Sequence, residues 1–453
     1  MVTLSQEQAI EISKSKTFSW DKMEPFYRSA ILIFGIIIIL IAIKNDVFLN
    51  WEFNKMGRVE SLFFRYLLFI SGLIFIGSII FRTILWFRYR PYNIDKVKSW
   101  PKAVVVVPAY NEGETVYKTI CSITNSNYPK NKLKIVAIDD GSTDNTYFFL
   151  DKAKKRFPNI VQIIKFEKNK GKRKALYEAY KQSKSTFMIT VDSDTYLKPN
   201  AIKEILTPLI LNNKIGATTG RIRIWNQNAN IFTKMLNANF AMAFDFSRAV
   251  QSTFTSVFCL SGAFSAYRVS ILNNVMEDWI NQKFLKKPCT YGEDRSLTNH
   301  VLRIGFGTFY QRSAISFTIV PESFLKVLKM FTRWTRSNIR ESIIFSKFMF
   351  NSNRKGNRIL PFVDFSSIIS LVIFHFFWFY YFILSGFVDG NLIMRIFAYS
   401  ALFGFFYMLY YLRIEGKKDV PYVLVFSLFT TMFSILIFTV AGFTLTTKKW
   451  SNR

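Results

Sequence analysis

The sequence predicts an α/β domain, with a mostly parallel sheet and helices on both faces, inserted between transmembrane helices. Three observations support this prediction. Long apolar blocks lie at 27–43 and 61–87 and again at 359–385, 392–412 and 421–446. Between the two groups, strand-like and helix-like segments alternate, as in α/β domains. Acidic residues follow the ends of predicted strands, which is where ligands bind in such sheets.

The N-terminal part is expected to be a cytosolic tail over 1–26, followed by two transmembrane helices within 27–87. The tail carries charges of both signs, and each apolar block has roughly the 20 residues that a helix needs to cross a bilayer core. Two buried core helices are the alternative. They are disfavoured because only the short stretch 44–60 separates the two blocks.

A soluble domain is predicted over 100–322. It opens with a run of buried-strand character that Pro108 stops, and strands and helices alternate after it. Strands are expected at 103–112, 134–146, 161–166 and 186–194, and helices at 115–124, between the second and third strands, and at 171–183.

Two acidic pairs mark the expected ligand site. Asp139 and Asp140 end one strand, Asp192 and Asp194 end another, and the basic turn 170–174 lies between them in the sequence. Adjacent carboxylates repel unless a cation lies between them. Carboxylates can bind a metal ion and lysines can bind phosphate, so this combination of residues suits a nucleotide diphosphate as ligand. The alternative is a solvated turn with acidic caps.

Two segments have the mixed apolar and cationic pattern of helices on a membrane face. One is 323–350, which is expected to form amphipathic interfacial helices. The other is 230–246, which could line the junction with the membrane or equally pack on the sheet.

The C-terminal membrane region is expected over 359–446, as two spans plus a third span or re-entrant segment, before the basic tail 447–453. Basic loops favour the cytosolic side. The loop 386–391 has no Lys or Arg and is expected outside, whereas the basic loop 413–419 is expected inside. A third span would carry the basic tail outside, so 421–446 is expected to enter and return, or to lie partly in the interface.

Charge and cysteine content narrow the partners. The formal net charge is +30, and much of the basic excess flanks the apolar blocks, so the lipid bilayer is the expected partner and nucleic acid is not. Three scattered cysteines and two histidines make a zinc site improbable. The sequence contains neither GxxxxGK[ST] nor GxGxxG, the phosphate loops of ATPases and Rossmann domains. No obligatory protein partner is predicted.

Six motifs occur in the order found in family 2 glycosyltransferases: VVVPAYNE, AIDDGSTDNT, NKGKRKAL, VDSDT, GEDRSLTN and RW at 333–334. The chain resembles the membrane-embedded processive synthases of this family over roughly residues 100–345. These are hyaluronan synthase, chitin synthase and the Nod-factor chito-oligosaccharide synthase. SGAFSAYR (261–268) and DRSLTN (294–299) are most similar to hyaluronan synthases.

The resemblance implies a GT-A fold, an inverting mechanism and a role for each matching residue. Asp294 would be the catalytic base. Mg²⁺ or Mn²⁺ on the UDP diphosphate would be held by Asp192 and Asp194. The remaining roles would be nucleotide binding by Asp139, Asp140, Lys172 and Arg173, acceptor binding by Glu293, Arg295, Arg333 and Trp334, and contacts from the tail by Trp450 and Arg453.

Some of these residues depart from the family's motifs or have an alternative structural role. Met330 replaces the Gln of the family's Q-x-x-R-W, which leaves the acceptor geometry open, and the tail WSNR lacks the Gly and Thr of W-G-T-R. Glu293 could be a helix-start acid, and Trp334 could anchor the chain at the membrane interface.

The resemblance implies a multi-pass plasma-membrane enzyme with a cytosolic catalytic domain. It would polymerise UDP-sugar donors, UDP-GlcNAc with UDP-glucuronate, into a β-linked, hyaluronan-like polysaccharide and export the growing chain. Arg221, Arg223, Arg268 and Arg295 are candidates to meet the glucuronate carboxylate. One alternative is a chitin or chito-oligosaccharide synthase that uses UDP-GlcNAc only. Another is a non-catalytic membrane protein that exports or binds polysaccharide.

Overall fold

The computed structural model describes residues 20–45, 58–350, 358–385 and 392–447. Most of the N-terminal tail, the loop 386–391 and the predicted tail contacts Trp450 and Arg453 lie outside the described residues.

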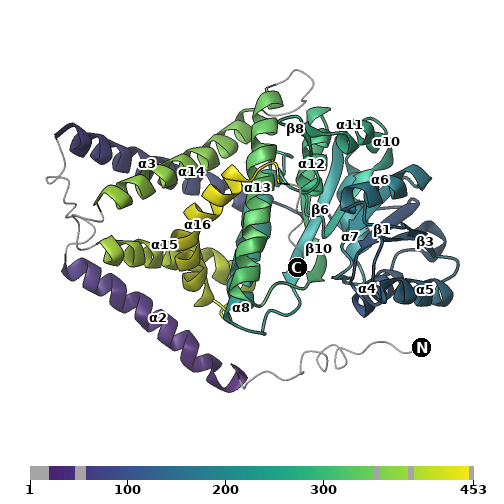
Figure 1. Ribbon diagram of the computed structural model, residues 1–453, viewed down its shortest axis with the longest axis horizontal. Helices are drawn as coiled ribbons and strands as arrows, with labels where there is room; N and C mark the ends of the chain where they lie inside the picture. Colours follow the sequence, from purple (N-terminus) through teal and green to yellow (C-terminus); the bar gives the residue numbers. More distant parts are fainter. Residues whose placement is uncertain (1–19, 46–57, 351–357, 386–391, 448–453) are drawn as a thin grey trace.

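An eight-stranded sheet forms the centre of the soluble domain, in the order β3-β2-β1-β4-β7-β6-β10-β5 (Figure 1). Its strands are β1 (Ala103–Ala109), β2 (Leu133–Asp139), β3 (Val161–Lys165), β4 (Phe187–Val191), β5 (Thr195–Leu197), β6 (Ile215–Ile224), β7 (Phe264–Arg268) and β10 (Gly307–Thr318). A separate two-stranded sheet pairs β8 (Lys283–Phe284) with β9 (Lys287–Pro288).

Most strands of the central sheet run in one direction, which confirms the predicted mostly parallel α/β fold. β1 is parallel to β2 and β4, β2 to β3, and β6 to β10. Only β7 and β5 oppose the neighbours with which they pair. Because β1 separates β2 from β4 in parallel register, the residues after β2 and β4 emerge at the same edge of the sheet.

Helices cover the two faces of the sheet (Figure 1). The 3₁₀ turns η3 (Ile94–Lys96) and η4 (Lys130–Lys132) precede β1 and β2. The helices are α4 (Glu114–Thr124), α5 (Thr146–Arg156), α6 (Lys172–Gln182), α7 (Ala201–Leu211), α8 (Ile231–Ala241), α9 (Ala249–Ser252), α10 (Val269–Leu272), α11 (Met276–Ile280) and α12 (Glu293–Arg303). The core lies between these layers, and all seven residues of β1 are buried.

The amphipathic segment 230–246 forms α8 and then a π-helix, η5 (Met242–Arg248). α8 packs on β6 and also contacts the membrane-side helices α15 (Leu392–Glu415) and α16 (Tyr422–Phe443). Both predictions for this segment therefore describe it in part, since it lies on the sheet and at the junction.

The apolar blocks form long helices that extend from one side of the α/β domain (Figure 1). α2 (Trp20–Lys44) packs with α15, and α3 (Arg58–Arg88) packs with α14 (Ile359–Ser385). Four stretches are long and apolar enough to cross a membrane: Phe26–Lys44, Arg65–Arg88, Ile393–Glu415 and Tyr422–Phe443. In α14 the described stretch Ile359–Phe374 is apolar but shorter. Large apolar side chains such as Leu40 and Phe69 are exposed on these helices, as expected for surfaces that face lipid.

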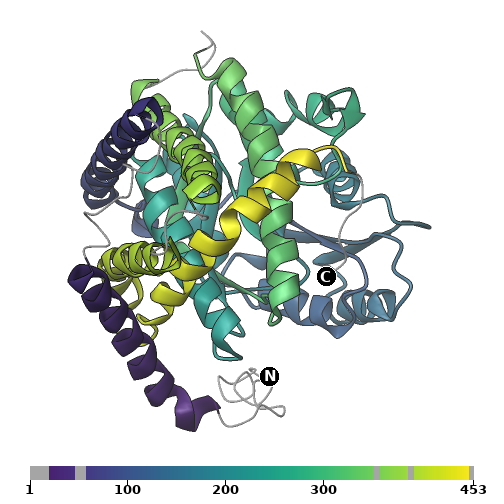
Figure 2. The ribbon, with the colours of Figure 1, turned by 60° about the vertical axis from the view of Figure 1, so that its left-hand side comes forward.

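α16 follows a different course from the other apolar helices. It lies across α13 (Phe324–Phe348) (Figure 2) and packs on α8 and α15. Just before α16, Asp419 lies 3.6 Å from both Arg28 and Lys234. Just after it, the Tyr291 hydroxyl donates to the Leu445 carbonyl at 2.6 Å.

These contacts bear on the predicted re-entrant segment. α16 is one continuous helix, so the chain does not turn back within Tyr422–Phe443, and a hairpin there is wrong. Residues of the α/β domain contact the chain at both ends of the helix. Contact at both ends is the arrangement expected of a helix that lies along the domain.

Candidate active site

The residues after β1 and β4 open onto one large cavity of about 1300 Å³. Asp139 and Asp140, at the end of β2, are not among the residues that line it. Lys172, Asp192, Asp194, Glu293 and Asp294 line one region of it. They come from the start of α6, the end of β4 and the start of α12, which are far apart in the sequence. The fold therefore brings together five of the residues predicted for the site.

Lys172 joins two of these elements. Its Nζ pairs with the Asp192 carboxylate and lies 3.1 Å from Glu293 Oε1. Burial opposes protonation of Lys172, but the charges of Asp192 and Glu293 outweigh burial and raise its pKa. The ammonium is thus a fixed positive charge beside the acidic residues, in a position suited to a phosphate.

Asp294 lies at the first turn of α12, held by two backbone donors. The Gly262 N–H donates to its Oδ2 at 3.1 Å, and the Arg295 N–H donates to its Oδ1 at 2.7 Å. Gly292 precedes the helix at φ 68°, a left-handed conformation that favours glycine. A Cβ there would lie 2.0 Å from Ser337 Oγ on α13, so this turn requires glycine for space as well.

The environments of Glu293 and Asp294 shift their pKa values in opposite directions. Burial raises the pKa of Asp294, and the neighbouring Glu293 carboxylate raises it further. Burial also opposes ionisation of Glu293, but Lys172 outweighs it and lowers the pKa of Glu293. Such a separation is typical of a site in which one carboxylate accepts a proton and the other stays ionised. Because Glu293 also starts α12, its prediction as a helix-start acid fits equally well.

Asp139 is the last residue of β2 and Asp140 follows it, and the two carboxylates have different hydrogen-bond partners. Backbone N–H groups of Lys170 and Gly171 donate to the two Asp140 oxygens at 2.7 and 2.9 Å, so Asp140 holds the basic turn in place. Asp139 accepts from the Ser142 N–H at 3.0 Å through Oδ1. Its buried Oδ2 has no hydrogen-bond partner among the described residues. Of these two aspartates, only Asp139 therefore has a carboxylate oxygen without a hydrogen-bond partner among the described residues.

Arg173 lies away from the cavity, in contrast to its predicted place near the nucleotide. Its guanidinium donates to the Trp279 carbonyl and lies 4.9 Å from the centre of the Trp279 ring. Successive residues on a helix point about 100° apart. Lys172 faces the cavity, and Arg173 consequently packs in the domain core against α11.

The predicted acceptor residues line the next region of the cavity. Arg333 and Trp334 on α13 border it, and Met330, which stands where the family has Gln, also lines it. The Trp334 ring centroid lies 6.0 Å from that of Phe240 on α8. Trp334 is therefore held by aromatic packing with one side towards the cavity.

Sequence reasoning missed the contribution of the π-helix. Ala243, Phe244, Ser247 and Arg248 of η5 line the cavity between α8 and the membrane-side helices. π-Helices are frequent at functional sites. The amphipathic pattern of 230–246 predicted a helix there, but a hydrophobic period does not reveal a wider turn.

Comparisons with known proteins agree with this geometry. Residues 104–276 match the profile of Glycosyl transferase family 2. The chain carries a family 2 glycosyltransferase domain.

Relatives of known name extend the match beyond that domain. Hyaluronan synthase from Streptococcus pyogenes is 34% identical over 280 residues, which are 61% of this chain and 65% of that protein. An N-acetylglucosaminyltransferase from Mesorhizobium japonicum is 30% identical over 275 residues, 59% of this chain and 64% of that protein. The match thus spans slightly less than two thirds of the length of either relative.

The fold of the family 2 domain is also that of solved GT-A enzymes. Mannosyltransferase PcManGT from Pyrobaculum calidifontis, solved in complex with GDP-Man and Mn²⁺, superposes with a TM-score of 0.54. It is 15% identical and covers 81% of this chain and 99% of its own. The predicted GT-A fold is therefore confirmed.

The acidic residues of the family 2 domain include a pair that suits a metal ion shared with a ligand. Among the described residues, no three His, Cys, Asp or Glu side chains converge to hold a metal ion by themselves. Asp192 and Asp194 both line the cavity, and carboxylate oxygens are the donors that Mg²⁺ and Mn²⁺ prefer. A pair of carboxylates fits a cation whose other ligands are diphosphate oxygens and water.

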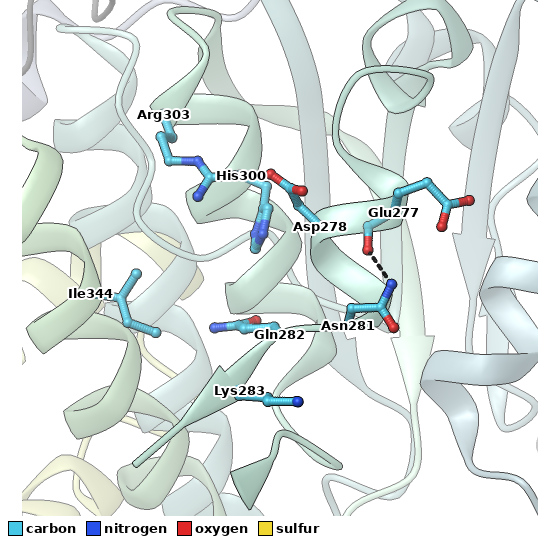
Figure 3. A pocket seen from close by; sticks show the side chains of 8 residues that line it. All are labelled: Glu277, Asp278, Asn281, Gln282, Lys283, His300, Arg303 and Ile344. Carbon is cyan, nitrogen blue, oxygen red and sulfur yellow. Dashed lines mark hydrogen bonds and ion pairs between the residues drawn. The ribbon is translucent and has the colours of Figure 1, made fainter. Parts of the chain in front are cut away.

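A second pocket, of about 440 Å³, is lined by residues on or next to α11, α12 and α13 (Figure 3). Its charged side chains include Arg303 and Asp278, which pair at 2.7 Å. Figure 3 also shows Asn281, whose amide donates to the Glu277 carbonyl at 3.0 Å. None of the predicted site residues lines this pocket.

Proposed function

We propose that this chain is a processive, inverting glycosyltransferase that polymerises UDP-sugars into a β-linked polysaccharide. The observation that carries the proposal is the position of Asp294, whose pKa is raised, in a single cavity. That cavity runs from Asp192 and Asp194, past Trp334, to the apolar helices α14 and α16. A single cavity would therefore contain the donor site, the catalytic base, the acceptor site and the exit path of the product.

The acidic end of the cavity is the donor site. Asp192 and Asp194 would hold Mg²⁺ or Mn²⁺, which supplies positive charge to the diphosphate when bound. Lys172 adds a fixed cation beside the same group. Asp139, at the end of the neighbouring strand β2, has a buried Oδ2 without a partner among the described residues, which would accept a hydrogen bond from the uracil N–H. These residues orient the diphosphate and stabilise the charge that develops on UDP.

Asp294 would act as the base. The acceptor hydroxyl oxygen attacks C1 of the donor sugar from the face opposite UDP, and the bond from C1 to the UDP oxygen breaks. The hydroxyl proton passes to the Asp294 carboxylate, and UDP leaves with the bonding electron pair. A raised pKa brings a carboxylate closer to the optimum for proton transfer at neutral pH.

Trp334 would hold the acceptor sugar. An indole face binds a pyranose ring by apolar contact and leaves it free to slide, as a growing chain requires. The ring packing against Phe240 fixes the indole while one side remains at the cavity. The alternative role, an anchor at the membrane interface, is compatible with this one.

The far end of the cavity would be the exit for the polymer. Phe365 and Val372 of α14 and Phe438 of α16 line it there. We infer that α2, α3, α14 and α15 span the plasma membrane, with α16 along the interface and the catalytic domain in the cytosol. The basic segments that border the domain favour this orientation.

The product is proposed to be hyaluronan-like, made from UDP-GlcNAc and UDP-glucuronate. The 34% identity to a hyaluronan synthase favours this product. A chitin-type synthase that uses UDP-GlcNAc alone is the second candidate, favoured by the 30% identity to an N-acetylglucosaminyltransferase. A non-catalytic exporter has no need for the divergent pKa shifts of Glu293 and Asp294.

Donor dependence tests the proposal. Purified full-length protein in lipid should make high-molecular-mass polymer only with both donors, and hyaluronidase should destroy that polymer. Chitinase-sensitive polymer from UDP-GlcNAc alone would identify the second candidate. The matched control is Asp294→Asn, which should retain UDP binding but lose about 10²–10⁴ in rate. Full activity of this variant would exclude Asp294 as the base.

A further inference from the structure

Four arginines are candidates to meet a sugar carboxylate, and the structure separates them. Arg221 pairs with Asp245 at 2.6 Å, and Arg221 and Arg223 both pair with Glu415 at the end of α15. Arg268 donates to backbone carbonyls, including that of Ile215 at 2.9 Å. These three side chains brace the sheet and its junction with α15, and none of them lines the large cavity.

Arg295 differs from these three arginines. It follows Asp294 directly and lines the cavity. Its guanidinium donates to Asn338 Oδ1 at 2.6 Å and to Ser342 Oγ at 2.8 Å, both on α13. Its buried Nε has no partner, and no carboxylate pairs with it within the described part of the chain. A cation that is largely removed from water and whose hydrogen-bond partners are all neutral can accept an anion at low cost.

A second cation lies in the same part of the cavity. Arg248 of η5 lines it and donates to the Cys259 and Ala243 carbonyls, each at 3.0 Å. Its partners are neutral as well. Burial lowers the pKa of Arg295, the nearby Cys259, Glu341 and Asp294 act to raise it, and Arg248 is close enough to lower it again. Two guanidinium groups that repel each other in a cavity form a site for an anion.

The carboxylates that line the cavity belong to the α/β domain and to the chain just before α13. They are Glu112, Asp192, Asp194, Glu293, Asp294 and Glu322, and the cation Lys172 lies among them. The described lining residues of α13, η5, α14 and α16 include Lys326, Lys329, Arg333 and Arg248 but no carboxylate. An anion bound by these helices would lie on the acceptor side of Asp294, and the donor diphosphate would lie on the other side.

From this division we infer that Arg295 and Arg248 bind the carboxylate of a uronic acid residue at the end of the acceptor chain. The inference rests on the proposed function and deepens it, because it assigns acceptor specificity to this cationic pair. Arg295 forms the principal contact, since its Nε has no hydrogen-bond partner among the described residues and its main chain already holds Asp294. A neutral acceptor would leave both guanidinium groups with neutral hydrogen-bond partners only.

The test compares two acceptors that differ only in this charge. Purified full-length protein in lipid is given UDP-GlcNAc and an oligosaccharide that ends either in glucuronate or in glucose. Wild type should prefer the glucuronate-ended acceptor in kcat/KM. Arg295→Gln should reduce that preference about tenfold or more, the size expected of a charge-assisted hydrogen bond. A structural role for Arg295 would instead lower transfer to both acceptors equally.

A second variant changes the charge and keeps the arginine. Asn338→Asp places a carboxylate where Asn338 Oδ1 now accepts from Arg295, so it should also abolish the preference. Asn338→Ala, which removes the same partner without adding charge, is the matched control and should keep it. An unchanged preference in both Arg295→Gln and Asn338→Asp would overturn the inference.

Binding of the two oligosaccharides without donor separates this inference from the proposed function. Tighter binding of the glucuronate-ended acceptor, lost in Arg295→Gln, supports the cationic site even if wild type transfers no sugar. The absence of transfer would overturn only the proposed function. Equal binding of both acceptors by wild type would overturn the cationic site while polymerisation continued.

Discussion

Lys172 Nζ lies 3.1 Å from Glu293 Oε1, and the same ammonium pairs with Asp192. One side chain thus joins the acids that would face the donor to the helix that carries Asp294. The Glu293 side chain is 8% exposed, so its charge depends on this partner. The proposed donor and acceptor sites are therefore linked electrostatically through Lys172.

Replacing Lys172 should destabilise the protein as well as weaken UDP binding. Lys172→Met leaves the buried Glu293 carboxylate without its cation, and loss of one partner of a buried pair costs about 3–5 kcal/mol. Thermal unfolding should therefore begin at a clearly lower temperature. Lys181→Met is the control, because Lys181 on the same helix pairs with Glu178 at the surface, where such pairs contribute about 0–1 kcal/mol. Equal melting temperatures for the two variants would contradict this role.

Activity should fall on the acid side at a higher pH than for an ordinary aspartate. Asp294 acts as a base only when ionised, and burial followed by the charge of Glu293 raises its pKa. Activity is therefore present above that pKa and is lost as the pH falls through it. The acidic limb of kcat/KM should lie above the usual aspartate pKa of about 3.9. The residual rate of Asp294→Asn should lack this limb, and an identical limb in the variant would assign the pKa to another group.

Alanine at Asp192 or Asp194 should weaken UDP binding only when metal is present. Each change removes one oxygen donor of a cation that prefers oxygen ligands. UDP affinity measured with Mn²⁺ and again with EDTA should differ for wild type and differ much less for either variant. Binding that EDTA leaves unchanged in wild type would exclude a metal at this pair. Asp151→Ala serves as the control, since Asp151 pairs with Lys155 on the surface of α5.

The C-terminal end of α16 should lie on the cytosolic side. Tyr291 contacts Leu445, so a thiol placed at Thr447 should share the compartment of the catalytic domain. With the three native cysteines replaced by serine, Thr447→Cys should resist an impermeant maleimide in intact cells and react after permeabilisation. Gly390→Cys, in the loop expected outside, should react in intact cells. Labelling of Thr447→Cys without permeabilisation would make α16 a full span.

The first half of the sheet could be predicted from the sequence because its residues are almost uniformly apolar. The predicted strand at 103–112 contains β1, and the predicted helices at 115–124 and 171–183 correspond to α4 and α6 within a residue at each end. Strands β6, β7 and β10 were not predicted. β6 carries Thr218 and Thr219, which are buried and donate to the Ile205 and Phe264 carbonyls. Such polar strands depend on tertiary partners that a local pattern does not reveal.

The sequence predicted which residues belong to the candidate site, but it did not predict which way their side chains face. Motif order placed Lys172 and Arg173 together, but only the packing of Trp279 shows that Arg173 faces inwards. The pairing of Lys172 with Glu293 joins residues that are far apart in the sequence. The neutral partners of Arg295 lie on α13, an element whose contacts were unknown.

The hydrogen bond from Tyr291 to Leu445 ties the end of α16 to the chain three residues before Asp294. A second bond, from Arg340 on α13 to the Tyr291 carbonyl at 2.6 Å, fixes the same residue. In its proposed position at the membrane interface, the apolar helix α16 would have its depth set by the thickness and composition of the bilayer. A change in lipid that moves this helix would pull on Tyr291 and shift the proposed base relative to its substrates. Polymer output would then respond to the physical state of the membrane, without any ligand or modification.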